Sequence, residues 1–189
     1  MLQLLLGIAL FFGIHSVSML ALPLRNRLVA KSELGWKLFY SLISLLGLVL
    51  MVRGYAEFKL SSPLIYQSPV WLHSVAAVLL LPVFILSLAP YLPGRISITF
   101  GHPQLVAVIH WAFAHLLVNG SVADLLLFGS FLVWALADRV SMAKRPARSI
   151  PQLPKSPIND VLLILLGLAA YAVFVFWLHE WLFGVAVFG

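Results

Sequence analysis

The chain has 189 residues, of which 62% are hydrophobic and only 10% are charged, and its net charge is +6. A soluble domain carries charge on roughly a quarter of its residues, so this composition excludes an ordinary soluble protein. The mean hydropathy of +1.06 predicts an integral membrane protein in a lipid bilayer. The basic residues flank apolar segments, so we interpret them as topology signals and expect no nucleic-acid partner. The absence of cysteine excludes disulfides and thiolate metal sites.

Six apolar runs follow one another along the chain, and a membrane-spanning helix needs about 20 such residues. The runs cover residues 2–22, 37–57, 70–90, 103–118, 122–140 and 159–183, of which the fourth is short for a span. No basic residue precedes the first run, so we expect a retained span rather than a cleaved signal peptide. Asn159 is expected to cap the last helix. We predict an all-α, polytopic membrane bundle of about six transmembrane helices, forming a single domain over residues 1–189.

The distribution of lysine and arginine predicts the orientation of this bundle. Basic residues concentrate in the loops at about 24–36, 91–102 and 141–158. The positive-inside rule places such loops in the cytoplasm. Both termini are therefore predicted on the periplasmic side.

Three histidines, His15, His110 and His115, lie inside apolar runs. An ionisable residue within a span is a hypothesis of a functional site, because a buried polar group without a partner is costly. Counted from Arg25 and Pro103, His15 and His115 lie about 15 Å and 18 Å from the cytoplasmic side at 1.5 Å per residue. His110 and His115 point about 140° apart on a straight helix, so at most one of them shares a site with His15.

Several kinds of chemistry suit two imidazoles in an apolar bundle. They could be the axial ligands of haem iron, they could transfer protons, or they could simply hydrogen-bond neighbouring helices. Zinc is less suited, because it normally takes four ligands. Asn119 and Asp124 bracket the turn that follows His115; this is ordinary turn and cap chemistry, although the turn could cover a site there.

The chain resembles the NnrU family over nearly its whole length. The resemblance rests on six segments in this order: GIHS (13–16), YLPGRI (91–96), HP (102–103), WAFAHLLVNG (111–120), LLLFGSFLVWALADR (125–139) and FVFWLHEWLFG (174–184). That family is associated with nitrite and nitric oxide reduction in denitrifying bacteria. Its distant relatives include the zeta-carotene isomerase, a haem b membrane enzyme that isomerises a central cis double bond.

The resemblance implies a protein of the bacterial cytoplasmic membrane. If the isomerase's haem ligation carries over, His15 and His115 are the ligands of the haem b iron. His102 would be the family's HP histidine, and His110, His102 and Asn119 are weaker candidates for cofactor binding. The sequence departs from the family's pattern at Phe113 and Val118, where members of the family are expected to carry smaller side chains.

Three functions stay open at this point. The first is a haem-b protein that supports nitrite and nitric oxide metabolism. The second is a haem-dependent cis-trans isomerase of a poly-cis carotene or another polyene, with Ala107, Ala112 and Ala114 leaving room for the substrate. The third is a transporter or an assembly factor without cofactor, although no inverted repeat favours transport.

Overall fold

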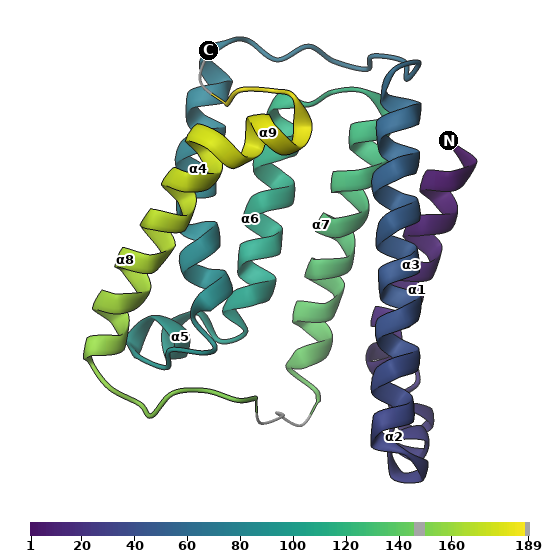
Figure 1. Ribbon diagram of the computed structural model, residues 1–189, viewed down its shortest axis with the longest axis vertical. Coiled ribbons are helices and arrows are strands. Elements are labelled where there is room, and N and C mark those ends of the chain that lie inside the picture. Colours follow the sequence, from purple (N-terminus) through teal and green to yellow (C-terminus); the bar gives the residue numbers. More distant parts are fainter. Residues whose placement is uncertain (146–149, 188–189) are drawn as a thin grey trace. The chain divides into compact units, whose positions relative to one another are not determined.

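The computed structural model describes residues 1–145 and 150–187, and the regular elements in these ranges are helices. In chain order they are α1 (Leu2–Leu20), α2 (Leu22–Lys31), α3 (Glu33–Lys59), α4 (Trp71–Leu88), α5 (Arg95–Phe100), α6 (Pro103–Val118), α7 (Val122–Met142), α8 (Ile158–Val173), the π-helical segment η1 (Phe174–Leu178) and α9 (His179–Phe183) (Figure 1). The predicted all-α fold class is confirmed. Residues 146–149, including Pro146 and Arg148 of the third predicted loop, lie outside the described residues.

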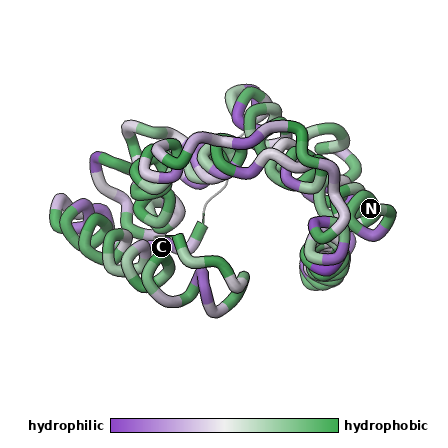
Figure 2. Tube along the Cα trace, turned by 90° about the horizontal axis from the view of Figure 1, so that it is seen from above, coloured by the Kyte–Doolittle hydropathy of each residue, from purple (hydrophilic) through white to green (hydrophobic). Residues whose placement is uncertain are grey.

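Five helical stretches in the described chain are long and apolar enough to cross a membrane. They are α1, α3, α4, α7 and the stretch Ile158–Phe183 that runs through α8, η1 and α9. The sixth predicted run is α6, which is apolar but has only 16 residues. Hydrophobic residues predominate along the helices (Figure 2), and α3 exposes large apolar side chains such as Leu38, Leu42 and Val49. A helix with apolar side chains all round belongs in lipid, so the chain is a multi-pass membrane protein.

The chain divides into two compact units, and each contains three of the apolar stretches. The first unit consists of residues 1–67 and 119–145 and contains α1, α2, α3 and α7. The second consists of residues 68–118 and 146–189 and contains α4, α5, α6 and the last stretch. His15 therefore belongs to the first unit, whereas His110 and His115 belong to the second.

Glycines allow the backbones of α1 and α3 to approach closely in the first unit. A Cβ atom added to Gly7 would lie 2.7 Å from Met51 Cα, and one added to Gly47 would lie 2.7 Å from the backbone nitrogen of Phe11. Gly54 meets the start of α1 in the same way. Small residues at helix contacts are typical of membrane proteins, where close packing replaces the hydrophobic effect as the driving force. This packing fixes α1 antiparallel to α3.

The first predicted loop contains a helix that the sequence did not indicate. Ala21 interrupts the helical backbone (φ −138°, ψ 48°), so α1 ends at Leu20 and α2 begins at Leu22. Pro23 lies in the first turn of α2, where a proline is tolerated because its missing N–H would have no helical partner. The loop expected at about residues 24–36 is therefore mostly helical, and Pro23 starts its helix.

In the second unit, two polar residues of α8 hold the start of α5 and the segment that leads into it. The Asp160 carboxylate accepts hydrogen bonds from the backbone N–H groups of Arg95 (2.9 Å) and Ile96 (3.1 Å). The Asn159 amide donates to the carbonyl oxygens of Pro93 (2.9 Å) and Pro154 (3.0 Å). The predicted N-cap role of Asn159 is therefore wrong: α8 begins one residue earlier, and the amide satisfies loop carbonyls instead. The YLPGRI segment is consequently a structural junction.

Candidate functional site

His15 projects from α1 with its protonation pattern fixed by the helix itself. Its Nδ1 lies 2.7 Å from the carbonyl oxygen of Phe11, one turn earlier. A carbonyl oxygen only accepts hydrogen bonds, so Nδ1 carries the proton and donates. In the neutral ring the lone pair therefore sits on Nε2, which points away from its own backbone. This is the tautomer that a histidine needs to ligate a metal through Nε2.

Aromatic rings from three helices of the first unit surround the half-buried His15 imidazole. Phe11 stacks on it with ring centroids 4.1 Å apart, Tyr40 of α3 lies at 5.1 Å, and Trp134 of α7 meets it edge-on at 5.8 Å. Phe12 extends the cluster by contacting Trp134 at 5.7 Å. These contacts orient the imidazole and keep water away from most of its surface. The indole Nε1 of Trp134 is buried and finds no hydrogen-bond partner among the described residues.

A buried ion pair lies one helical turn beyond this cluster. Phe11 contacts Phe131 and His15 contacts Trp134, so α1 and α7 run in the same direction. Asp138 follows Trp134 by one turn and pairs with Arg145. The two side chains are only 13% and 12% exposed. Asp138 is close enough to interact electrostatically with His15.

The predicted depth of His15 needs a correction. The count from Arg25 assumed a continuous helix, whereas α1 ends at Leu20. His15 thus lies five residues before the end of its helix, about 7.5 Å along the axis at 1.5 Å per residue. His115 lies twelve residues after Pro103, as counted from the sequence, and three residues before the end of α6. Measured from the observed helix ends, the His15 and His115 rings therefore do not lie at equal distances from the predicted cytoplasmic side.

In the second unit, α6 gives its two histidines the same tautomer as His15. Nδ1 of His110 lies 2.8 Å from the Val106 carbonyl oxygen, and Nδ1 of His115 lies 2.9 Å from that of Trp111. Nε2 therefore carries the lone pair in both neutral rings. His115 also contacts the Trp111 ring at 5.1 Å. Because His15 and His115 belong to different units, their sharing of one cofactor stays a prediction.

His102 occupies a backbone position that is unusual for a residue with a side chain. Its φ angle is +31°, the one positive value that the structure gives for a non-glycine residue in the described ranges. Its carbonyl oxygen accepts hydrogen bonds from Leu105 and Val106 in the first turn of α6. The HP segment thus starts a helix at the cost of local backbone strain.

The alanines of α6 are packed rather than open. Ala107, Ala112 and Ala114 are at most 2% exposed. In membrane bundles, buried alanines permit close helix contact. Their burial favours close helix contact over room for a substrate, and the isomerase hypothesis stays untested.

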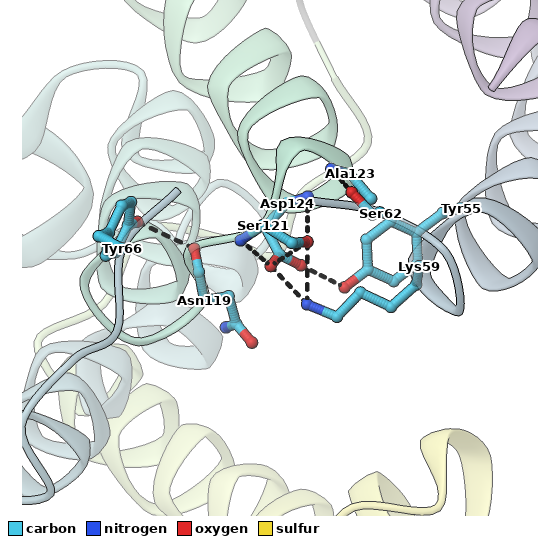
Figure 3. A network of polar contacts seen from close by, with 8 residues as sticks. All are labelled: Tyr55, Lys59, Ser62, Tyr66, Asn119, Ser121, Ala123 and Asp124. Atoms are coloured by element: carbon cyan, nitrogen blue, oxygen red, sulfur yellow. Dashed lines mark hydrogen bonds and ion pairs between the residues drawn. The ribbon is translucent and has the colours of Figure 1, made fainter. Parts of the chain in front are cut away.

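A second polar cluster surrounds Asp124 at the start of α7 (Figure 3). Asp124 is fully buried, and its carboxylate accepts a hydrogen bond from the Tyr55 hydroxyl (2.7 Å) and pairs with the Lys59 ammonium. Ser121 and Asp124 form a capping box, in which the Ser121 backbone N–H donates to the carboxylate (2.8 Å). The Ser121 hydroxyl is a fourth donor to the Asp124 carboxylate, at 2.7 Å. These four donors compensate the cost of burying the negative charge of Asp124.

The same cluster explains Asn119 and the turn around it. The Asn119 carbonyl oxygen accepts a hydrogen bond from the Tyr66 hydroxyl (2.9 Å), and the Gly120 carbonyl oxygen accepts from the backbone of Ile65 (2.8 Å). These bonds tie residues 62–66 to the start of α7. The sequence predicted cap chemistry at Asp124 but not its contacts with Tyr55 and Lys59. These residues lie more than 60 positions before Asp124, so no local sequence pattern indicates the contacts.

Among the described residues, no group of three or more His, Asp or Glu side chains gathers to hold a metal ion. The described residues therefore contain no cluster of three or more such side chains that could hold a metal ion without a cofactor. Haem asks less of the protein, because the macrocycle supplies four nitrogen ligands and the chain only the axial ones. The donor set around His15, a single oriented imidazole with aromatic neighbours, fits that requirement.

The comparison with protein families identifies one match. The family model described as NnrU protein matches residues 3–187, which is nearly the whole chain and includes both units. No curated protein and no solved structure matches the chain.

Proposed function

Because the chain belongs to the NnrU protein family, we propose that it is a multi-pass protein of the bacterial cytoplasmic membrane that binds haem b through His15 and His115. In this proposal it serves nitrite and nitric oxide metabolism. The observation that carries the proposal is the His15 imidazole, which donates Nδ1–H to the Phe11 carbonyl and is held among the rings of Phe11, Tyr40 and Trp134. The His115 imidazole donates Nδ1–H to the carbonyl four residues earlier in the same way.

The surroundings of His15 support the same assignment. A histidine that only stabilises packing needs partners for its polar atoms, whereas an axial ligand needs a fixed ring with an unprotonated Nε2. The Phe11 carbonyl and the rings of Tyr40 and Trp134 provide that fixation. The buried, unpartnered Nε1 of Trp134 is one donor that packing alone leaves unexplained.

Each residue then has a defined task. His15 and His115 would hold the iron, and the backbone carbonyls of Phe11 and Trp111 keep Nδ1 protonated so that Nε2 is the nitrogen available to it. The aromatic rings exclude water from the ligand pair. When bound, haem b would supply an iron capable of electron exchange and of nitric oxide binding.

The test is the visible absorption spectrum of the protein purified in detergent with haem supplied during expression. We expect a Soret band that shifts on reduction, and its loss in His15→Ala and in His115→Ala. His110→Ala is the matched control, because this histidine lies on the same helix as His115 and makes the same type of backbone hydrogen bond. The exposed His73 gives a second control.

The outcomes separate the possibilities. If both controls keep the band and both ligand variants lose it, the proposal holds. A preparation that stays colourless after haem reconstitution overturns it, and so does a band that survives in His15→Ala and His115→Ala. A coloured protein that isomerises a poly-cis carotene, and does not respond to nitric oxide, would move the function to the isomerase class while keeping the site.

A further inference from the structure

The geometry of the ion pair between Asp138 and Arg145 does not explain it as a contact that holds the first unit together. The pair joins the last part of α7 to the residue that follows it by seven positions, so it bridges no two distant elements. Both side chains are nine-tenths buried or nearly so, and burying two charges costs several kcal/mol before their attraction is counted. A buried pair is therefore weak support for stability by itself.

The pair is also incompletely satisfied. Nε of Arg145 is buried and has no hydrogen-bond partner within the described residues, and the same holds for Nε1 of Trp134 one turn before Asp138. Buried donors in native structures nearly always have partners. Within the described residues, one unpartnered donor thus lies on α7 against the His15 ring and the other follows the end of α7, which indicates that this region is arranged for something besides packing.

The position of the pair relative to His15 follows from the helix contacts. Trp134 touches His15, and Asp138 lies on the same face of α7 because residues four apart in a helix share a face. Asp138 interacts electrostatically with His15 and with Tyr40, whose ring contacts His15. Charges in a poorly solvated environment act on one another much more strongly than charges in water.

We propose that the Asp138–Arg145 pair sets the reduction potential of the iron held at His15. This inference rests on the proposed function. The carboxylate stabilises the more positive, oxidised iron and so lowers the potential, while the guanidinium acts in the opposite direction. Hydrogen bonding and charge around a haem are among the ways in which proteins tune its potential.

The sign of each effect gives the test. The potential is measured by spectroscopic redox titration of the haem-loaded, full-length protein in detergent, at constant ionic strength. Asp138→Asn removes a negative charge and shifts the potential to a more positive value. Arg145→Gln removes a positive charge and shifts it to a more negative value. The double variant carries the same net charge as the wild type and returns towards its potential.

Glu33→Gln is the matched control. Glu33 belongs to the same unit and also forms an ion pair, with Lys37, but both side chains of that pair are 67% exposed. Solvent and salt screen such a charge, so this variant keeps the wild-type potential.

Opposite shifts in the two single variants support the inference, because damage to packing would move both potentials in the same direction. Unchanged potentials, or shifts of the same sign, overturn the inference and leave haem binding intact. Should one single variant fail to fold, the other and the double variant still decide the sign. A wild-type protein that takes up no haem overturns the proposed function and this inference together.

Discussion

The contact between α1 and α3 makes a sharp prediction about Gly7. In Gly7→Ala the new Cβ would lie 2.7 Å from Met51 Cα and 2.8 Å from the Gly47 carbonyl oxygen. Ordinary contacts between carbon atoms are about 3.5–4.0 Å, so the helices must separate locally by roughly 1 Å. Both contacts are to backbone, which has no side-chain rotamer with which to move aside.

The cost can be worked out from two opposing effects. Overpacking of this kind costs about 1–3 kcal/mol, whereas alanine is about 1 kcal/mol better than glycine in a helix interior. We therefore expect Gly7→Ala to lower the free energy of unfolding by up to about 2 kcal/mol. The separation also draws α1 away from Tyr40 on α3, so under the proposed function we expect weaker retention of haem at His15.

Gly13 supplies the control within the same helix. It is exposed, and a Cβ added there meets nothing within 4 Å, so Gly13→Ala gains helix propensity without a clash. The assay is reversible denaturation in mixed micelles, followed by tryptophan fluorescence. If Gly7→Ala unfolds at the same denaturant concentration as Gly13→Ala, the argument from close backbone contact is wrong.

Two further predictions concern the cluster at the start of α7. Lys59→Met leaves the buried Asp124 carboxylate without its counter-charge and should destabilise the protein by about 1–3 kcal/mol. The cost is smaller than for a fully buried pair because the Lys59 side chain is 39% exposed. In the same denaturation assay, Lys37→Met breaks an exposed pair and should cost under about 1 kcal/mol. Gly120→Ala would place a Cβ atom 2.7 Å from Cδ2 of Tyr66 and still closer to its carbonyl oxygen, so we expect residues 62–66 to detach from α7. Limited proteolysis at this segment would increase in that variant, and unchanged cleavage would contradict the proposed contact.

The helices were predictable because their signal is local. Apolar run length placed all six apolar helical stretches within a few residues of their observed bounds, since a span needs only its own residues to satisfy its backbone. The same locality explains the tautomers: the acceptor of each buried histidine lies four residues earlier on its own helix. Neither property depends on where other helices lie.

The failures have the opposite cause. Pro23 is compatible with ending one helix and with starting another, and sequence patterns do not choose between them. Asn159 has the side chain of an N-cap, but its amide satisfies carbonyl oxygens of Pro93 and Pro154, which only the folded chain brings within reach. The side chain of Asn159 is suited both to capping a helix and to bonding loop carbonyls, and the folded position of Pro93 and Pro154 decides between the two.

By itself the sequence determined that this is a helical membrane protein with imidazoles inside its apolar segments, because composition, run length and helical period are properties of short stretches. Only the tertiary structure decided what touches those imidazoles. The neighbours of His15 come from α3 and α7, at positions as distant as Tyr40 and Trp134. In a chain so uniformly apolar, many pairings of helix faces look equally good from hydropathy, and the close approach at a few glycines distinguishes one of them.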